Sequence, residues 1–184
     1  MGREVERAIE DLIENLRSHN DGIKWVSLAN LHLTLKFLGP SVPIEKIRRL
    51  AAELEKIAAA TDSFEIEIAG VGGFPNLKHP NVLWVGLRSD ERAALAARVD
   101  EVSAGAGFER EQRPFRAHLT IARLKHPLHP ETRARIEAAS GRDFGISTIA
   151  EMTLYRSITA PAGPIYEALH EFKFSSGAGL RSSS

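Results

Sequence analysis

The chain has 184 residues, of which 43% are hydrophobic and 26% charged, a composition typical of a globular protein with one domain or two small lobes. Its 24 basic and 24 acidic residues balance, so the net charge gives no indication of nucleic-acid binding. The absence of cysteine excludes a disulfide framework, a thiolate nucleophile and a cysteine-based metal site. No apolar run is long enough to span a membrane, and we expect a cytoplasmic protein.

The first half of the chain alternates between helical and strand periodicity. Residues 3–18 carry apolar side chains at helical spacing with acidic residues between them, which predicts an amphipathic helix. Gly39 and Pro40 end an apolar run that reads as a strand. The predicted elements that follow the first helix are a short strand over 24–26, a strand over 31–38, a helix over 43–60, a strand over 64–68, a loop over 71–80 and a strand over 82–87.

The second half repeats this order. Its predicted elements are a helix over 90–104, a strand over 115–124, a helix over 130–140 and strands over 144–149, 151–157 and 165–174. Strand, helix, strand, strand therefore occurs twice, which predicts two similar α+β lobes about a pseudo-twofold axis. The Ser/Gly-rich tail over 175–184 is predicted to be disordered.

A short polar motif occurs in both halves. The chain reads His32-Leu33-Thr34 in the first predicted motif strand and His118-Leu119-Thr120 in the second. Because side chains alternate along a strand, each histidine shares a face with its threonine, and the leucine points to the other face. We expect the two histidines to face each other across a central cleft.

Two paired imidazoles and two hydroxyls suit acid–base chemistry on an oxygen-rich anion. One histidine can take a proton from water while the other donates one to a leaving oxygen. Each threonine hydroxyl can donate a hydrogen bond to an oxygen of the group between them, for which a phosphodiester is the natural candidate. The structural alternative is two core histidines, but their repetition in matched contexts favours function.

These motifs and their surroundings resemble a known family. The chain is similar to the 2H phosphoesterases, and among them to the RNA 2',3'-cyclic phosphodiesterases, also called 2'-5' RNA ligases. The resemblance runs from about residue 3 to about residue 174. It is carried by Asn30–Gly39, Gly70–Pro75, Val82–Gly86, Phe115–Arg123, Arg156–Ser157 and Gly163–Tyr166.

The resemblance implies an α+β, bilobal fold of two pseudo-symmetric antiparallel sheets flanked by helices, with residues 1–174 as one domain. It implies metal-independent hydrolysis of RNA 2',3'-cyclic phosphate ends, or of a cyclic nucleotide, to 2'-phosphomonoesters, with possible reversal as 2'-5' ligation. His118 would be the base and His32 the acid, and Thr34 and Thr120 would hold the phosphate oxygens. No cofactor or metal is implied.

Two features depart from the family pattern. Ala117 stands where the family has proline before the second histidine. The short apolar strand that opens the family fold is absent, because the sequence starts directly in the first predicted helix. We therefore expect an incomplete first sheet, in a monomer or in a strand-swapped dimer.

Further substrate-binding residues are proposed with alternatives. Arg123 matches the family's phosphate-binding arginine, yet its parity puts it on the face opposite His118 unless the strand ends or bulges near Ala122. Lys36 lies an even number of residues from His32, so in a strand its side chain would share the face of the histidines. It is either a residue at the rim of the cleft or a surface salt-bridge partner. Phe74, in a Gly/Pro loop, can stack a base. The neighbouring Trp84 reads as a core residue.

Two functions of other classes remain open at this stage. One is a catalytically weak RNA- or nucleotide-binding module that has kept the cleft and lost turnover. The other is a metallohydrolase, for which His126 and His129 are the candidate ligands, although no carboxylate stands at a regular offset from them.

Overall fold

The computed structural model describes residues 1–17, 22–160 and 163–176. The chain forms two compact units, each assembled from three separate segments. Unit 1 comprises Met1–Thr34, Glu65–Asp90 and Arg116–Thr148. Unit 2 takes the remaining segments, 35–64, 91–115 and 149–184. Both histidine–threonine motifs therefore belong to unit 1.

Four α-helices and seven strands make up the described chain. In order they are α1 (Arg3–Leu16), β1 (Lys24–Trp25), the short 3₁₀ helix η1 (Leu28–Asn30), α2 (Ile44–Ala59), β2 (Phe64–Phe74), β3 (Val82–Arg88), α3 (Asp90–Gly105), β4 (His118–Arg123), α4 (Pro130–Ala138), β5 (Asp143–Ile149), β6 (Glu151–Ala160) and β7 (Gly163–Lys173). The predicted α+β class is confirmed, as are all four predicted helices.

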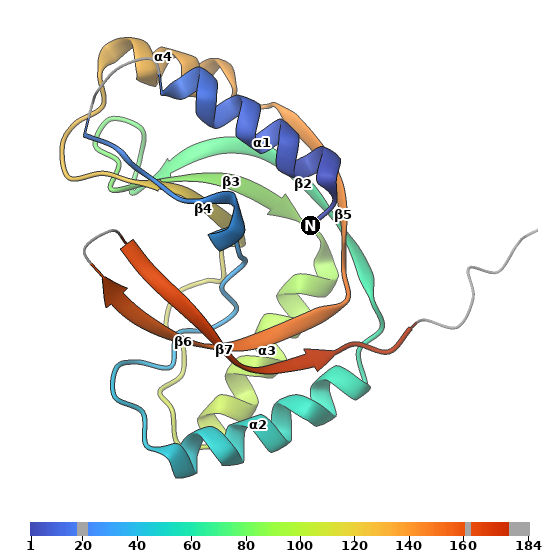
Figure 1. Cartoon of the computed structure of the whole chain (residues 1–184). Helices are drawn as coiled ribbons and strands as arrows, with labels where there is room; N and C mark the ends of the chain where they lie inside the picture. The colour runs from blue at the N-terminus through green and yellow to red at the C-terminus, as the bar shows by residue number, and fades with distance from the viewer. Residues whose placement is uncertain (18–21, 161–162, 177–184) are drawn as a thin grey trace, which may run out of the picture. The chain divides into compact units, whose positions relative to one another are not determined.

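Unit 1 is built on a five-stranded sheet in the order β1-β4-β3-β2-β5. The pairs β1–β4, β4–β3 and β3–β2 are antiparallel. Helices α1 and α4 lie together against one face of this curled sheet (Figure 1). That face carries the buried apolar residues Leu83, Val85, Leu119 and Ile121, all at most 5% exposed. The opposite face of the sheet is not covered by these two helices and holds the polar side chains of His118 and Thr120.

Helix α1 forms because its apolar side chains recur at helical spacing. Its buried residues are Val5, Ile9, Leu12, Ile13 and Leu16, and the acidic residues between them point to solvent. Burying five aliphatic side chains at about 1.5–3 kcal/mol each explains why this helix holds to the sheet. The helix predicted over 3–18 is thus confirmed, with its end at Leu16.

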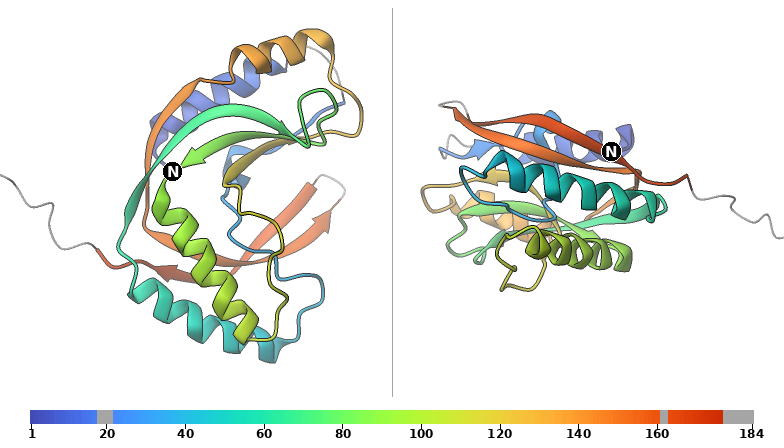
Figure 2. Two further views of the ribbon diagram at one scale, coloured as in Figure 1. Left: turned by 180° about the vertical axis from the view of Figure 1, so that it is seen from behind. Right: turned by 90° about the horizontal axis from the view of Figure 1, so that it is seen from below.

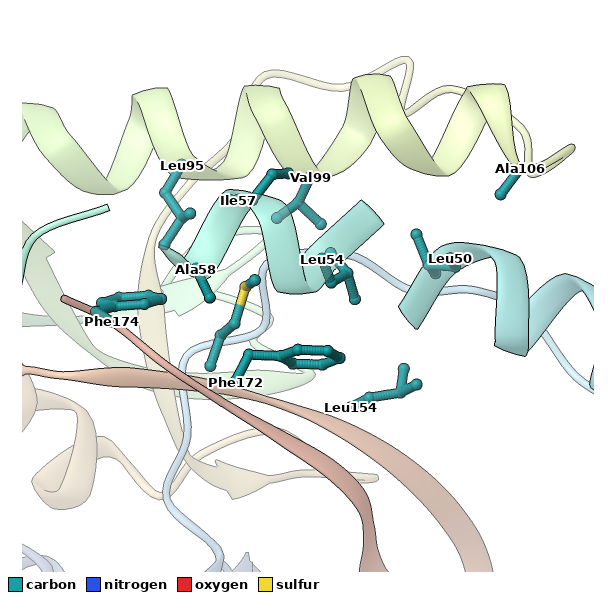
Figure 3. Close-up of a cluster of buried hydrophobic side chains, with 11 residues drawn as sticks. Leu50, Leu54, Ile57, Ala58, Leu95, Val99, Ala106, Leu154, Phe172 and Phe174 are labelled. Atoms are coloured by element: carbon teal, nitrogen blue, oxygen red, sulfur yellow. The ribbon is translucent and has the colours of Figure 1, made fainter. Parts of the chain in front are cut away.

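Unit 2 packs α2 and α3 against the two-stranded hairpin of β6 and β7 (Figure 2). Its core is a cluster of aliphatic and aromatic side chains in which Phe172 is fully buried (Figure 3). Leu35 and Leu38 pack against this cluster. Predicted strand 144–149 becomes β5 and joins the sheet of unit 1, so only two strands of the final predicted group form the hairpin.

The strand predicted over 31–38 is wrong. Only Leu33 forms a β-bridge, and the residues after it have no regular structure. The chain passes from unit 1 to unit 2 after Thr34. Its alternating leucines are therefore shared between two cores, and Phe37, which alternation would bury, is 79% exposed.

The loop predicted over 71–80 is also wrong in its first half. Strand β2 continues to Phe74, with Val71–Phe74 paired to Val85–Val82 of β3. Gly72 and Gly73, which favoured a loop in the sequence, are paired residues of the sheet. Gly70 has a φ of +80°, next to a register shift between Ile68 and Val71.

The predicted disordered tail is only partly covered. Ser175 is ordered, since its backbone N–H donates to the Thr61 carbonyl at 2.9 Å and its own carbonyl accepts from the Ser63 N–H at 3.0 Å. Residues 177–184 lie outside the described residues. Within the described ranges, no helix combines the length and apolar composition needed to cross a bilayer.

Candidate functional site

The second motif lies in the interior of the five-stranded sheet. Strand β4 is paired on both sides, with β1 and with β3. Leu119 is buried on the face covered by the helices, whereas His118 and Thr120 are half-buried on the other face. The alternation predicted for this motif is confirmed.

The first motif reaches the second through a single bridge. Leu33 pairs antiparallel with Leu119, the residue at the equivalent place in the other motif. Residues that flank an antiparallel bridge are expected to oppose each other in reverse order, which would set His32 across from Thr120 and Thr34 across from His118. The central leucines of the two motifs therefore meet at this bridge.

In that register the two histidines would take diagonal positions on one face. Diagonal neighbours in an antiparallel pair lie roughly 7–8 Å apart. Each threonine would then lie beside the histidine of the other motif.

Both histidines are held in the same way. Nδ1 of His32 lies 2.8 Å from the carbonyl oxygen of Asn30, and Nδ1 of His118 lies 2.7 Å from that of Arg116. A carbonyl oxygen only accepts hydrogen bonds, so each Nδ1 carries the proton. The neutral rings therefore have their lone pair on Nε2. This is the tautomer that a proton-transferring histidine needs, and both motifs produce it by a bond to residue i−2.

An aromatic wall stands beside the second histidine. The ring of Phe74 meets the imidazole of His118 edge to face, with centroids 5.0 Å apart and an interplanar angle of 85°. Phe74 in turn packs on Trp84 with centroids 5.4 Å apart. The prediction that Phe74 stacks a base stays a prediction, because the described contacts of its ring are to His118 and Trp84.

Two glycines shape the sheet around this wall. A Cβ added to Gly72 would lie 2.3 Å from Cζ2 of Trp84, so the indole rests directly on the backbone of β2. Gly86 is the register partner of His118 and leaves no side chain beside the imidazole on β3. In the sequence both glycines lie in segments that carry the family resemblance, but their packing roles were not predicted. A glycine inside a strand pattern is the signal that marks such close approaches.

Strand β4 contains the bulge that Arg123 requires. Thr120 and Ala122 pair with consecutive residues of β3, so Ile121 is an extra residue in the ladder. Ile121 and Ala122 are both fully buried, as two successive residues on the core side must be. Beyond the bulge, Arg123 pairs with Val82, which shares its face with Trp84 and Gly86. The parity objection is thereby removed, and Arg123 lies on the face of His118.

Lys36 has a structural partner in unit 2. Its Nζ lies 2.5 Å from the carboxylate of Asp100 and donates to the Glu109 carbonyl at 2.7 Å. Its side chain is only 5% exposed. The Lys36 ammonium and the backbone N–H of Glu111 also hold the pKa of Asp100 below its ordinary value. Of the two readings of Lys36, the salt-bridge partner is the one observed.

The remaining metal hypothesis finds no support in the described residues. Over 1–17, 22–160 and 163–176, no three or more His, Cys, Asp or Glu side chains are grouped to hold a metal ion. His126 and His129 are exposed in the segment between β4 and α4.

Comparisons with known proteins agree on one family. A sequence model described as the 2'-5' RNA ligase superfamily matches residues 5–157. A protein of Archaeoglobus fulgidus named RNA 2',3'-cyclic phosphodiesterase is 35% identical over 170 residues, covering 92% of this chain and 93% of that protein. A protein of the same name from Thermotoga maritima is 32% identical over 180 residues, covering 96% of this chain and 93% of that protein.

A solved structure agrees in fold. The crystal structure of TT0787 from Thermus thermophilus matches with a TM-score of 0.81 and 25% identity, covering 96% of this chain and 95% of that one. The 2H phosphoesterase resemblance carried by the two motifs is confirmed. The chain belongs to the 2'-5' RNA ligase superfamily.

Proposed function

We propose that this protein hydrolyses 2',3'-cyclic phosphate ends of RNA to 2'-phosphomonoesters, using His32 and His118 and no metal. The observation that carries the proposal is the antiparallel pairing of two equal motifs at Leu33 and Leu119, with both imidazoles held through Nδ1. The substrate class is taken from the names of the relatives.

Since Nδ1 of each histidine is bonded to a backbone carbonyl, Nε2 is the nitrogen that would exchange protons with the substrate. His118 accepts a proton from water at Nε2 while the water oxygen attacks phosphorus. The bond from phosphorus to the ribose 3' oxygen breaks, and His32 in its protonated form donates a proton to that oxygen. The phosphate stays on the 2' oxygen. Each such proton transfer is worth about 10²–10⁴ in rate.

The threonines would bind the reacting phosphate. Thr34 and Thr120 are suited to donate hydrogen bonds to the non-bridging oxygens as charge accumulates on them in the transition state. The guanidinium of Arg123 lies on the same face, three residues beyond Thr120, and has the geometry that phosphates prefer. A 5'-hydroxyl that replaces water in the same steps would give a 2'-5' linkage, which is the ligase reaction.

The protein is proposed to act as a monomer in the cytoplasm. All groups in the scheme come from one chain, and four of them come from the two motifs of unit 1. The lack of cysteine fits a reducing compartment.

The test is turnover of a short RNA ending in a 2',3'-cyclic phosphate, in excess EDTA. We expect the wild type to remain active, and His32→Ala and His118→Ala each to lose a hundredfold or more. His79→Ala changes an exposed histidine of the loop after β2 and is the matched control, with unchanged activity. Loss of wild-type activity in EDTA would contradict the metal-independent scheme.

A second substrate separates the acid from the base. A phosphodiester with a p-nitrophenyl leaving group needs little protonation of the departing oxygen. We expect His32→Ala to regain much of its activity on this substrate and His118→Ala to stay inactive. The opposite pattern would reverse the two roles, and a folded wild type that binds RNA without turnover would favour the binding module.

A further inference from the structure

Two positive side chains lie directly opposite each other next to the second motif. Lys24 of β1 is the register partner of Arg123 of β4, and both are exposed. Their neighbours fix the face on which they lie. Trp25 pairs with buried Ala122. The guanidinium of Arg17, the residue that follows α1, lies over the Trp25 ring, 5.9 Å from the ring centroid. Because Trp25 faces the helices, Lys24 faces the side of the histidines.

This pair is not compensated within the described part of the chain. Neither Lys24 nor Arg123 forms an ion pair with a carboxylate there. Like charges directly opposite in a ladder destabilise the strand pair. An anion between the two side chains would relieve that repulsion, so the pair is a candidate anion site.

The site lies at a distance from the motif centre that one phosphate does not bridge. Arg123 is three residues beyond Thr120, which corresponds to roughly 10 Å of strand. The bulge at Ile121 keeps both on the same face. A nucleoside cyclic phosphate held between the histidines has no second phosphate to place there, whereas an RNA chain has one at its next linkage.

We propose that Lys24, together with Arg123, binds the phosphate that joins the last two nucleotides of an RNA substrate. The proposal rests on the proposed function and deepens it, because it makes an RNA end rather than a free cyclic nucleotide the preferred substrate. Contacts of this kind position the chain and carry no information on base sequence. Preference for RNA would therefore be independent of the sequence of the end.

The experiment compares kcat/KM for a trinucleotide with a 2',3'-cyclic phosphate end and for a nucleoside 2',3'-cyclic monophosphate, over a series of salt concentrations. For Lys24→Ala we expect roughly a tenfold loss on the trinucleotide and no change on the nucleoside. The slope of log kcat/KM against log salt for the trinucleotide should fall by about 0.7, the value for one phosphate contact on a single strand.

Two further variants control for charge and folding. Lys173→Ala removes an exposed lysine from β7. It should change neither kcat/KM for either substrate nor the salt slope. Lys24→Arg should retain both the preference and the slope. The Tm of Lys24→Ala should equal or exceed that of the wild type, since a repulsive charge has been removed.

Each result distinguishes this proposal from the function on which it rests. Equal losses on both substrates, or no loss on the trinucleotide, would overturn the second phosphate site while leaving the hydrolase intact. A wild type inactive on both substrates would contradict the proposed function itself.

Discussion

The two histidine–threonine motifs reach the same arrangement from different backbones. The second lies in β4, paired on both sides within a five-stranded sheet. The first follows the 3₁₀ helix η1, touches the sheet through one bridge at Leu33 and then passes into unit 2. Nevertheless, Nδ1 is bonded to the carbonyl of residue i−2 in both, at 2.8 Å for His32 and 2.7 Å for His118.

Each motif therefore orients its own imidazole through local backbone contacts. A regular strand is not needed to orient the imidazole, because the carbonyl two residues earlier fixes both the tautomer and the ring. The sheet supplies the second requirement, which is to bring the two motifs together in antiparallel register. Substitutions in and beside the motifs separate the properties that both motifs share from those that belong to one of them.

The largest effect in this comparison is expected from the threonines. Thr34→Val and Thr120→Val keep the shape of the side chain and remove the hydroxyl. A hydrogen bond to a charged group is worth about 1.5–3 kcal/mol, so each variant should lose roughly 10- to 100-fold in kcat/KM. Because the two motifs meet at their equivalent leucines and would bind the same phosphate, the two losses should be of similar size. Steady-state kinetics on a cyclic-phosphate RNA measure them.

Thr148→Val is the matched control, since Thr148 is an exposed threonine of β5 in the same unit. Its activity should equal that of the wild type. Strongly unequal losses for Thr34→Val and Thr120→Val would show that the two threonines do not bind the phosphate equivalently.

An intermediate effect is expected from a change that reaches only the second motif. In Gly72→Ala the new Cβ would lie 2.3 Å from Cζ2 of Trp84, so the indole must move. Overpacking of this kind costs about 1–3 kcal/mol of stability. Trp84 packs on Phe74, and Phe74 on His118, so kcat should also fall. Thermal unfolding and steady-state kinetics measure the two effects.

Gly141→Ala provides the control, because a Cβ at Gly141 meets nothing within 4 Å. It should change neither Tm nor kcat. If Gly72→Ala lowers Tm and leaves kcat unchanged, the aromatic wall is structural only and does not help to position His118.

The smallest effect on activity is expected from Asp100, which ties both motif-flanking segments together inside unit 2. Its carboxylate accepts from Lys36, two residues after Thr34, and from the backbone N–H of Glu111, which precedes the second motif. The pKa of Asp100 is lowered, chiefly by the hydrogen bond from Lys36. A carboxyl group whose pKa is lower in the folded state than in the unfolded state stabilises the fold at neutral pH. This stabilisation is lost as the pH falls through the pKa of the folded state.

Asp100→Asn should therefore be less stable than the wild type above about pH 5, by about 1–2 kcal/mol, and the difference should shrink below about pH 4. Urea unfolding across this pH range measures it. Asp62→Asn, at an exposed aspartate of the same unit, should show no such pH-dependent difference. A difference for Asp100→Asn that stays constant with pH would exclude the ionised carboxylate as its cause.

Local patterns predicted the elements whose surroundings are uniform along their length. The stripe of α1 packs on one sheet, and the alternation of β4 lies within one ladder, so periodicity sufficed for both. The segment over 31–38 was predicted wrongly because its leucines belong to two cores. Which core takes Leu33 and which takes Leu35 is a long-range property that alternation does not encode.

The candidate site was likewise predictable only where the signal is local in the sequence. The residue types and spacing of the two motifs identified His32 and His118, because the chemistry repeats in the sequence. The face of Arg123 depended on a bulge at Ile121, and the partner of Lys36 depended on α3. Lys24 carried no sequence signal, since its importance comes only from the strand beside it.

The bridge between Leu33 and Leu119 also bears on how such a site is assembled. Two copies of a short His-Leu-Thr peptide, paired antiparallel through their central leucine, would bring together the same two histidines and two threonines. Under the proposed function, the choice between the 2' and 3' oxygens of the ribose would then depend on groups that lie only beside the second motif, namely Phe74 and the Lys24–Arg123 pair.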